Sequence, residues 1–133
     1  MNKAKVYLVN RDFLLGHFPH SRQAALYANA AAKLNKFEAV SDASFTQQPV
    51  WIRDGNVDRV AASVLSVEEM GKVRKLLTNA SLDSAIKADM AEAQKIQIQR
   101  TPTMLISSKM QSQLKFDGGV SYPLLKKILA DLL

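Results

Sequence analysis

The chain has 133 residues, 47% of them hydrophobic and 23% charged, which gives it room for one globular domain and not two. It contains no cysteine, which excludes disulfides, thiolate nucleophiles and zinc sites built on cysteine. The formal net charge is +6, but the basic residues are spread along the chain, so we expect no nucleic-acid partner.

The first predicted element is a strand over Lys5–Phe13. Within it, Val6–Val9 is an uninterrupted β-prone run, as in a strand buried on both faces. A loop follows, and Ser21 is a suitable N-cap for an alanine-rich helix over Arg22–Leu34. The small side chains of that helix would allow another element to approach it closely.

The pattern next predicts a helix over Lys36–Gln47, with Phe45 on its apolar stripe. Pro49 should stop this helix and leave Trp51 in a loop, as a packing residue. Three more helices are predicted, and the capping-box sequence Ser66-Val67-Glu68-Glu69 opens the middle one. They are expected at Val57–Leu65, Val67–Leu77 and Leu82–Ile96.

In the C-terminal part, the spacing of the apolar residues changes from helical to strand-like. Met104–Ile106 and Gln113–Asp117 read as strands, Gly118-Gly119 as a tight turn, and Ser121–Leu133 as a helix. The predicted fold class is therefore mixed α/β, in the order strand, helices, strand, strand, helix. We expect a single domain over 1–133, with a helical insertion over 20–80.

The residues alone indicate no catalytic centre. His17 and His20 could form a metal or acid–base pair, but no third ligand is close in sequence, so we interpret them as loop residues. Arg11 and Asp12 read as a device that anchors the loop. The chain has neither GxxxxGK[ST] nor GxSxG, so we expect no catalytic residue, no metal and no cofactor.

Several stretches resemble the DsbA family of thioredoxin-like thiol–disulfide oxidoreductases. VNRDFLLGHFPHSRQAAL and KFEAVSDASFTQQPVW are similar to a strand of that family and the start of its helical insertion. AEAQKIQIQRTPTMLI is similar to its cis-proline loop, and FDGGVSYPLLKKIL to its last strand and helix. The resemblance implies a cis Thr101–Pro102 bond and a substrate-binding loop, for an extended peptide or protein segment, made of Arg100, Thr101, Pro102 and Thr103.

The departure from the family matters for activity. In the family a strand, a Cys-x-x-Cys motif and a helix precede the strand that here begins at Lys5, so the resemblance implies an N-terminally incomplete, truncated domain. Because disulfide exchange needs a thiolate, we expect this chain to be redox-inactive alone. The absent strand would leave edges unpaired, so we expect self-association, as in a homodimer.

Other hypotheses stay open. The chain could be a Cys-free module that binds peptides or proteins, or a relative of the glutathione-binding kappa-type transferases and isomerases. It could also be a helical interaction domain unrelated to thioredoxin, in which the Pro102 bond would be trans. The compartment is unknown: the family is usually exported, but the N-terminus lacks a signal-peptide cleavage site, and no apolar run is long enough to span a membrane.

Overall fold

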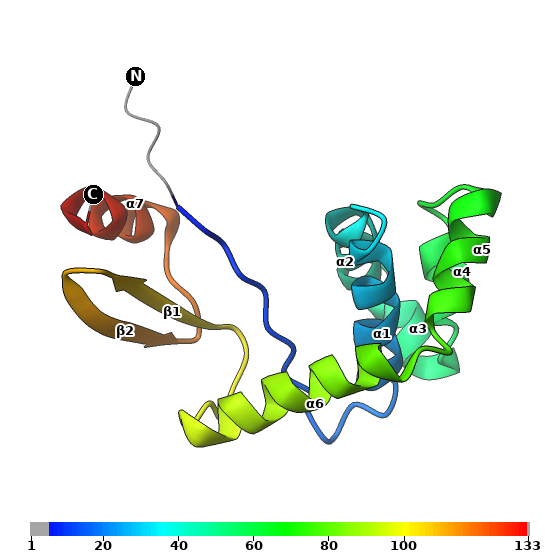
Figure 1. The fold of residues 1–133 in the computed structure, drawn as a ribbon, viewed down its shortest axis with the longest axis horizontal. Helices are drawn as coiled ribbons and strands as arrows, with labels where there is room; N and C mark the ends of the chain where they lie inside the picture. Colours follow the sequence, from blue (N-terminus) through cyan, green and yellow to red (C-terminus); the bar gives the residue numbers. More distant parts are fainter. Residues whose placement is uncertain (1–5, 133) are drawn as a thin grey trace. The chain divides into compact units, whose positions relative to one another are not determined.

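The computed structural model describes residues 6–132. Within them it contains seven helices and a two-stranded antiparallel sheet (Figure 1), which agrees with the predicted mixed α/β class. The described chain falls into two compact units. We call Arg11–Ala93 the helical unit, and residues 6–10 together with 94–132 the hairpin unit.

The helical unit contains five complete helices and most of a sixth. These are α1 (Ser21–Ala32), α2 (Phe37–Thr46), α3 (Gln48–Asp54), α4 (Val57–Ala62), α5 (Val67–Leu76) and α6 (Ala80–Lys95). The hairpin unit contains β1 (Thr103–Ser108), β2 (Gln111–Asp117) and α7 (Tyr122–Leu132). None of these helices is long and apolar enough to cross a membrane.

The strand predicted over Lys5–Phe13 is wrong for the described part of that range. Residues 6–13 form no strand, and Lys5 lies outside the described residues. Within residues 6–132, β1 pairs with β2 alone. The side chains of Val6–Val9 are accordingly 53–92% exposed. A β-prone sequence forms a strand only where a neighbour accepts its main-chain hydrogen bonds, and this segment has none here.

Two predicted helix boundaries are also wrong. Ser21 is the first residue of α1 rather than its cap, and its hydroxyl donates to the Phe18 carbonyl at 2.9 Å. Pro49 lies in the first turn of α3, where its missing N–H is not needed, so it helps to begin a helix. Trp51 is therefore helical and buried, whereas Phe45, predicted to face inward, is 74% exposed.

The capping box of α5 is confirmed. The Ser66 hydroxyl accepts from the Glu69 amide at 3.2 Å, and the Glu69 carboxylate accepts from the Ser66 amide at 2.8 Å. Both contacts satisfy main-chain donors that the first turn of a helix leaves unpaired.

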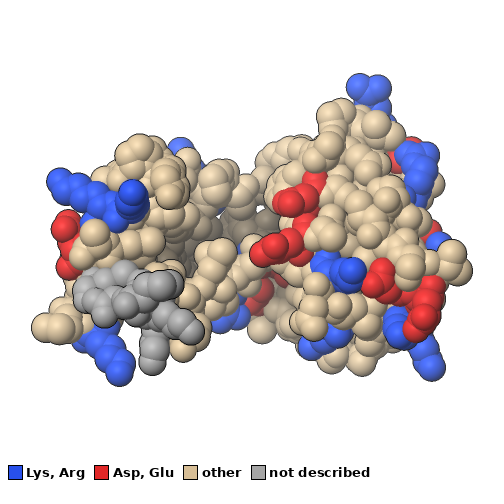
Figure 2. Space-filling view, turned by 90° about the horizontal axis from the view of Figure 1, so that it is seen from above, with Lys and Arg blue, Asp and Glu red and all other residues tan. Residues whose placement is uncertain are grey.

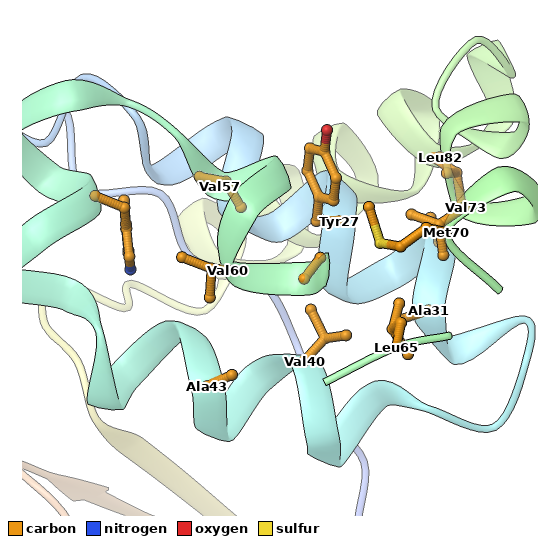
Figure 3. Packing of buried hydrophobic residues seen from close by; sticks show 13 residues of the cluster. Tyr27, Ala31, Val40, Ala43, Val57, Val60, Leu65, Met70, Val73 and Leu82 are labelled. Carbon is orange, nitrogen blue, oxygen red and sulfur yellow. The ribbon is translucent and has the colours of Figure 1, made fainter. Parts of the chain in front are cut away.

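The core of the helical unit lies between its helices (Figure 3). Ala30 and Ala31 of α1 are fully buried, and such small side chains let α1 lie close to α2 and α4. The core consists of Tyr27, Ala30, Ala31, Val40, Ala43, Trp51, Val57, Val60, Ala61, Leu65, Met70, Val73 and Leu82.

A polar network joins α1, α4 and α5 at the edge of this core. The Tyr27 hydroxyl donates to Asp58 at 2.8 Å. The Arg74 guanidinium donates to both Asp58 carboxylate oxygens, at 2.9 and 2.7 Å. Burial, with the Asp58 hydrogen bond, raises the pKa of Tyr27 to about 12. The Arg74 hydrogen bonds hold the pKa of Asp58 below its usual value.

The hairpin unit has little core of its own. The antiparallel register runs from Thr103↔Asp117 to Ser108↔Gln111. Among the described residues of this unit, Ile106 is the one buried hydrophobic side chain. No residue of α7 is buried, although its sequence is strongly amphipathic.

Candidate functional site: the Arg100–Thr103 loop

The loop that the resemblance marks as substrate-binding connects α6 to β1. The Thr101–Pro102 peptide bond is cis, the geometry that the resemblance implies. Arg100, Thr101 and Pro102 are exposed, and Thr103, the first residue of β1, is half-buried. The candidate residues therefore form one accessible surface at the start of a strand.

The Gly118-Gly119 pair supports this loop from the end of β2. The Gly118 amide donates to the Pro102 carbonyl at 2.8 Å. Gly119 has φ +88°, and a Cβ added there would lie 3.3 Å from the Cγ of Pro102. The sequence interpretation treated these glycines only as a tight turn. The signal for their second role was their position directly after a strand that pairs antiparallel with the start of β1.

Side-chain hydrogen bonds connect the loop to β1 and β2, and β2 to the segment that follows α6. The Thr103 hydroxyl donates to the Arg100 carbonyl at 2.7 Å and lies 3.2 Å from an Asp117 carboxylate oxygen. The Lys115 ammonium donates to the Gln97 carbonyl at 2.9 Å. Sequence analysis missed Asp117, Lys115 and Gln97, because their contacts depend on the register of the hairpin.

The hairpin register determines which main-chain groups of β1 face outward. The Pro102 carbonyl points to β2, because it accepts from Gly118. In an antiparallel pair this orientation alternates, so Met104 is hydrogen-bonded to β2, whereas the N–H and C=O of Thr103 and Leu105 point to the free edge. Within residues 6–132, no backbone hydrogen bond involves Thr101. Thr101 and the free edge of β1 thus offer main-chain donors and acceptors that have no partner within residues 6–132.

Replacing Gly119 with alanine should destabilise the hairpin unit by about 1–2 kcal/mol, because a side chain at positive φ is strained. The added Cβ would also press on Pro102. Gly118→Ala meets only the first cost, since nothing lies within 4 Å of its Cβ position. Urea denaturation followed by NMR of the hairpin amides should therefore rank Gly119→Ala as the less stable variant.

The control for this comparison is Gly71→Ala. Gly71 lies inside α5 with open space around its Cβ position, so alanine should stabilise that helix by about 0.5–1 kcal/mol. Equal stability of the Gly118→Ala and Gly119→Ala variants would contradict a supporting role of Gly119 for Pro102.

The other candidates lie in the helical unit and have structural roles. Arg11 forms an ion pair with Asp89 at 2.9 Å, and the Asp12 amide donates to the same carboxylate at 2.9 Å, as expected of a loop anchor. Burial raises the pKa of Asp12, which accepts from Asn29 at 2.6 Å.

Neither histidine belongs to a metal-ligand cluster. No group of three or more ligating side chains occurs in the described part of the chain. The His17 ring lies against Phe18, with ring centroids 4.3 Å apart. His20 covers Gly55, where an added Cβ would lie 2.7 Å from the imidazole. Both contacts agree with the interpretation as loop residues.

Charged side chains do not gather into one basic surface on the face shown in Figure 2, where blue and red side chains are scattered singly and in small groups. Two basic residues form ion pairs one turn away on their own helix, Lys72 with Glu68 and Lys87 with Asp83. The net charge of +6 is therefore not concentrated on that face.

A family model described as Thioredoxin matches residues 1–127, which include the whole helical unit, the Arg100–Thr103 loop and both strands. No curated protein and no solved structure matches the chain.

Proposed function

This chain belongs to the thioredoxin family, and on that premise we propose that it is a DsbA-like domain that binds extended polypeptide without thiol chemistry of its own. The binding site in this proposal is the Arg100–Thr103 loop together with the free edge of β1. The family match also removes the hypothesis of a helical domain unrelated to thioredoxin.

The absence of cysteine supports binding rather than catalysis. These 133 residues contain no thiol. Disulfide exchange proceeds by attack of a thiolate on sulfur, and no other side chain replaces it in that reaction. In this proposal the chain's own residues only hold a substrate segment, and any exchange at that segment uses thiols from elsewhere.

The outward-facing main-chain groups of β1 carry the proposal. Thr103 and Leu105 direct N–H and C=O to the free edge, and the exposed Thr101, which makes no backbone hydrogen bond within residues 6–132, lies next to that edge in sequence. An extended segment can pair with such an edge as an added strand, whose main-chain hydrogen bonds give affinity for many sequences. Broad specificity of this kind suits unfolded proteins as ligands.

Leu105→Pro tests this site directly. Because the Leu105 amide points away from β2, proline there should leave the hairpin intact but remove a donor from the free edge. We expect binding of a fluorescein-labelled unfolded protein, reduced and S-carboxymethylated, to weaken by about tenfold or more in fluorescence anisotropy.

Leu105→Ala is the matched control, because it also loses the leucine side chain but keeps the N–H. It should bind the labelled protein nearly as well as the natural chain. Unchanged binding by Leu105→Pro, with hairpin NMR signals intact, would refute the edge as the binding site.

Glutathione binding distinguishes this proposal from the remaining alternative, a relative of the glutathione-binding kappa-type transferases and isomerases. A relative of the kappa-type transferases should bind this tripeptide in a thiol pocket, and its melting temperature should then rise. The proposal made here expects no such rise, because the edge of β1 recognises a longer extended segment through its main chain.

A further inference from the structure

The segment Val6–Val9 belongs to the hairpin unit, but it pairs with no strand in the described structure and its apolar side chains stay exposed. Its side chains are 53%, 87%, 92% and 64% exposed from Val6 to Val9. Water-exposed apolar side chains that follow one another along a chain usually mark an interaction site. The composition is that of a strand, so the complementary surface should be a strand edge.

The sheet of the hairpin unit lacks a third strand, which such a segment could supply. A sheet of two strands is marginally stable by itself, and Ile106 is the one buried hydrophobic residue among the described residues of this unit. The apolar face of the hairpin carries Met104 and Ile106 on β1, opposite Phe116 and Leu114 on β2. A third strand at the edge of β1 would widen this face.

The segment can turn either of its two side-chain faces toward the apolar face of the hairpin. Successive side chains of a strand point to opposite faces, so Val6 and Leu8 would lie on one face, and Tyr7 and Val9 on the other. Both pairs are apolar, so either can continue the apolar face of the hairpin. Each copy of the chain carries both the segment and the edge, which is the condition for a closed, two-fold exchange.

We propose that Val6–Val9 of one copy adds as a strand to the free edge of β1 in a second copy, reciprocally, to form a symmetric dimer. In the described residues of a single chain this edge is unpaired. The inference rests on the proposed function, because the exchanged segment occupies the site assigned to extended polypeptide. Dimerisation and substrate binding then exclude each other, and the monomer is the binding form.

Leu8→Pro tests the donor side of the exchange. Leu8 lies outside any helix or strand and is 92% exposed, so proline should not disturb the monomer but should block strand pairing. The matched control is Val67→Pro. Val67 is also 92% exposed, and it occupies the first position of α5, where proline is tolerated.

Sedimentation equilibrium at micromolar concentration gives the first result. The natural chain and Val67→Pro should dimerise, whereas Leu8→Pro and Leu105→Pro should raise the dimer dissociation constant about tenfold or more. A natural chain that stays monomeric would overturn the inference. So would a Leu8→Pro or Leu105→Pro variant that dimerises as the natural chain does.

The second result separates this inference from the proposed function. A fluorescein-labelled peptide of residues 3–11 should bind the Leu8→Pro monomer, and adding Leu105→Pro should abolish that binding. The carboxymethylated unfolded protein should bind Leu8→Pro more tightly than the natural chain. If Leu105→Pro binds the unfolded protein as tightly as the natural chain but no longer dimerises, only the proposed function fails. If Leu8→Pro dimerises as the natural chain does, while Leu105→Pro loses binding of the unfolded protein, only the exchange fails.

Discussion

Replacing Trp51 with alanine should lower the free energy of unfolding by about 3–5 kcal/mol, the usual cost of removing a large buried aromatic side chain. Trp51 is 5% exposed and is the one buried residue of α3. Its indole N–H donates to the Ser44 carbonyl at 2.6 Å. The alanine variant therefore loses the buried side chain of α3, with only the partly buried Ile52 left to pack against the core, and leaves a buried carbonyl without that donor. Urea denaturation followed by circular dichroism measures the loss.

Two further variants show whether the effect comes from the buried indole. Trp51→Phe keeps most of the apolar volume and loses the N–H, so it should recover more than half of the lost stability. Val50→Ala changes a neighbouring side chain that is 52% exposed, and should stay within about 0.5 kcal/mol of the natural chain. A Trp51→Ala loss no larger than that of Val50→Ala would contradict the packing described for α3.

Replacing Asp58 with alanine should have the second largest effect, about 1–3 kcal/mol, because the buried Tyr27 hydroxyl loses its acceptor. The hydrogen bonds from Arg74 lower the pKa of Asp58 in the folded state. The stabilisation is therefore complete above the unfolded-state pKa, about 4, and is lost as the pH falls through the lower folded value. Urea denaturation across this range should show a smaller acid loss in Asp58→Ala than in the natural chain.

Tyr27→Phe examines the other end of the same network. The pKa of Tyr27 is raised from 10.0 to about 12, so between these values the unfolded state loses its proton first. The natural chain should then lose stability as the pH rises from 10 towards 12. Tyr27→Phe should lack this part of the alkaline loss. Identical alkaline profiles for the two chains would contradict the raised pKa of Tyr27, which arises from burial and from the hydrogen bond to Asp58.

The elements with local signals could be predicted from the sequence, and those that depend on a partner could not. The capping box at Ser66 and Glu69 works through residues that are neighbours on one helix turn, so its pattern is visible in the sequence. The strand over Lys5–Phe13 depends on a neighbouring strand, and its described residues form none. Pro49 is ambiguous for a similar reason, since proline both ends helices and begins them.

In the candidate site too, the sequence revealed the local feature but not the contacts made by distant residues. The Arg100–Thr103 loop came from a resemblance in sequence, and the structure presents its residues together at the start of β1. The support by Gly118 and Gly119 arises from the hairpin register and from positive φ values, neither of which a single sequence states. The orientation of the Leu105 amide, on which the proposed binding depends, comes from the same register.

The thin core of the hairpin unit also ties its stability to mass action. The unit has one buried hydrophobic residue among those described, so it would gain much of its folding free energy from a segment bound at the edge of β1 as proposed. An occupant present at a hundred times its dissociation constant adds about 2.7 kcal/mol to the apparent stability. The melting of the hairpin would then follow the concentration of its ligand, while the helical unit, with its own core, would melt independently of it. The folded fraction of the hairpin would thus follow the fraction of molecules that have a segment bound at the edge of β1.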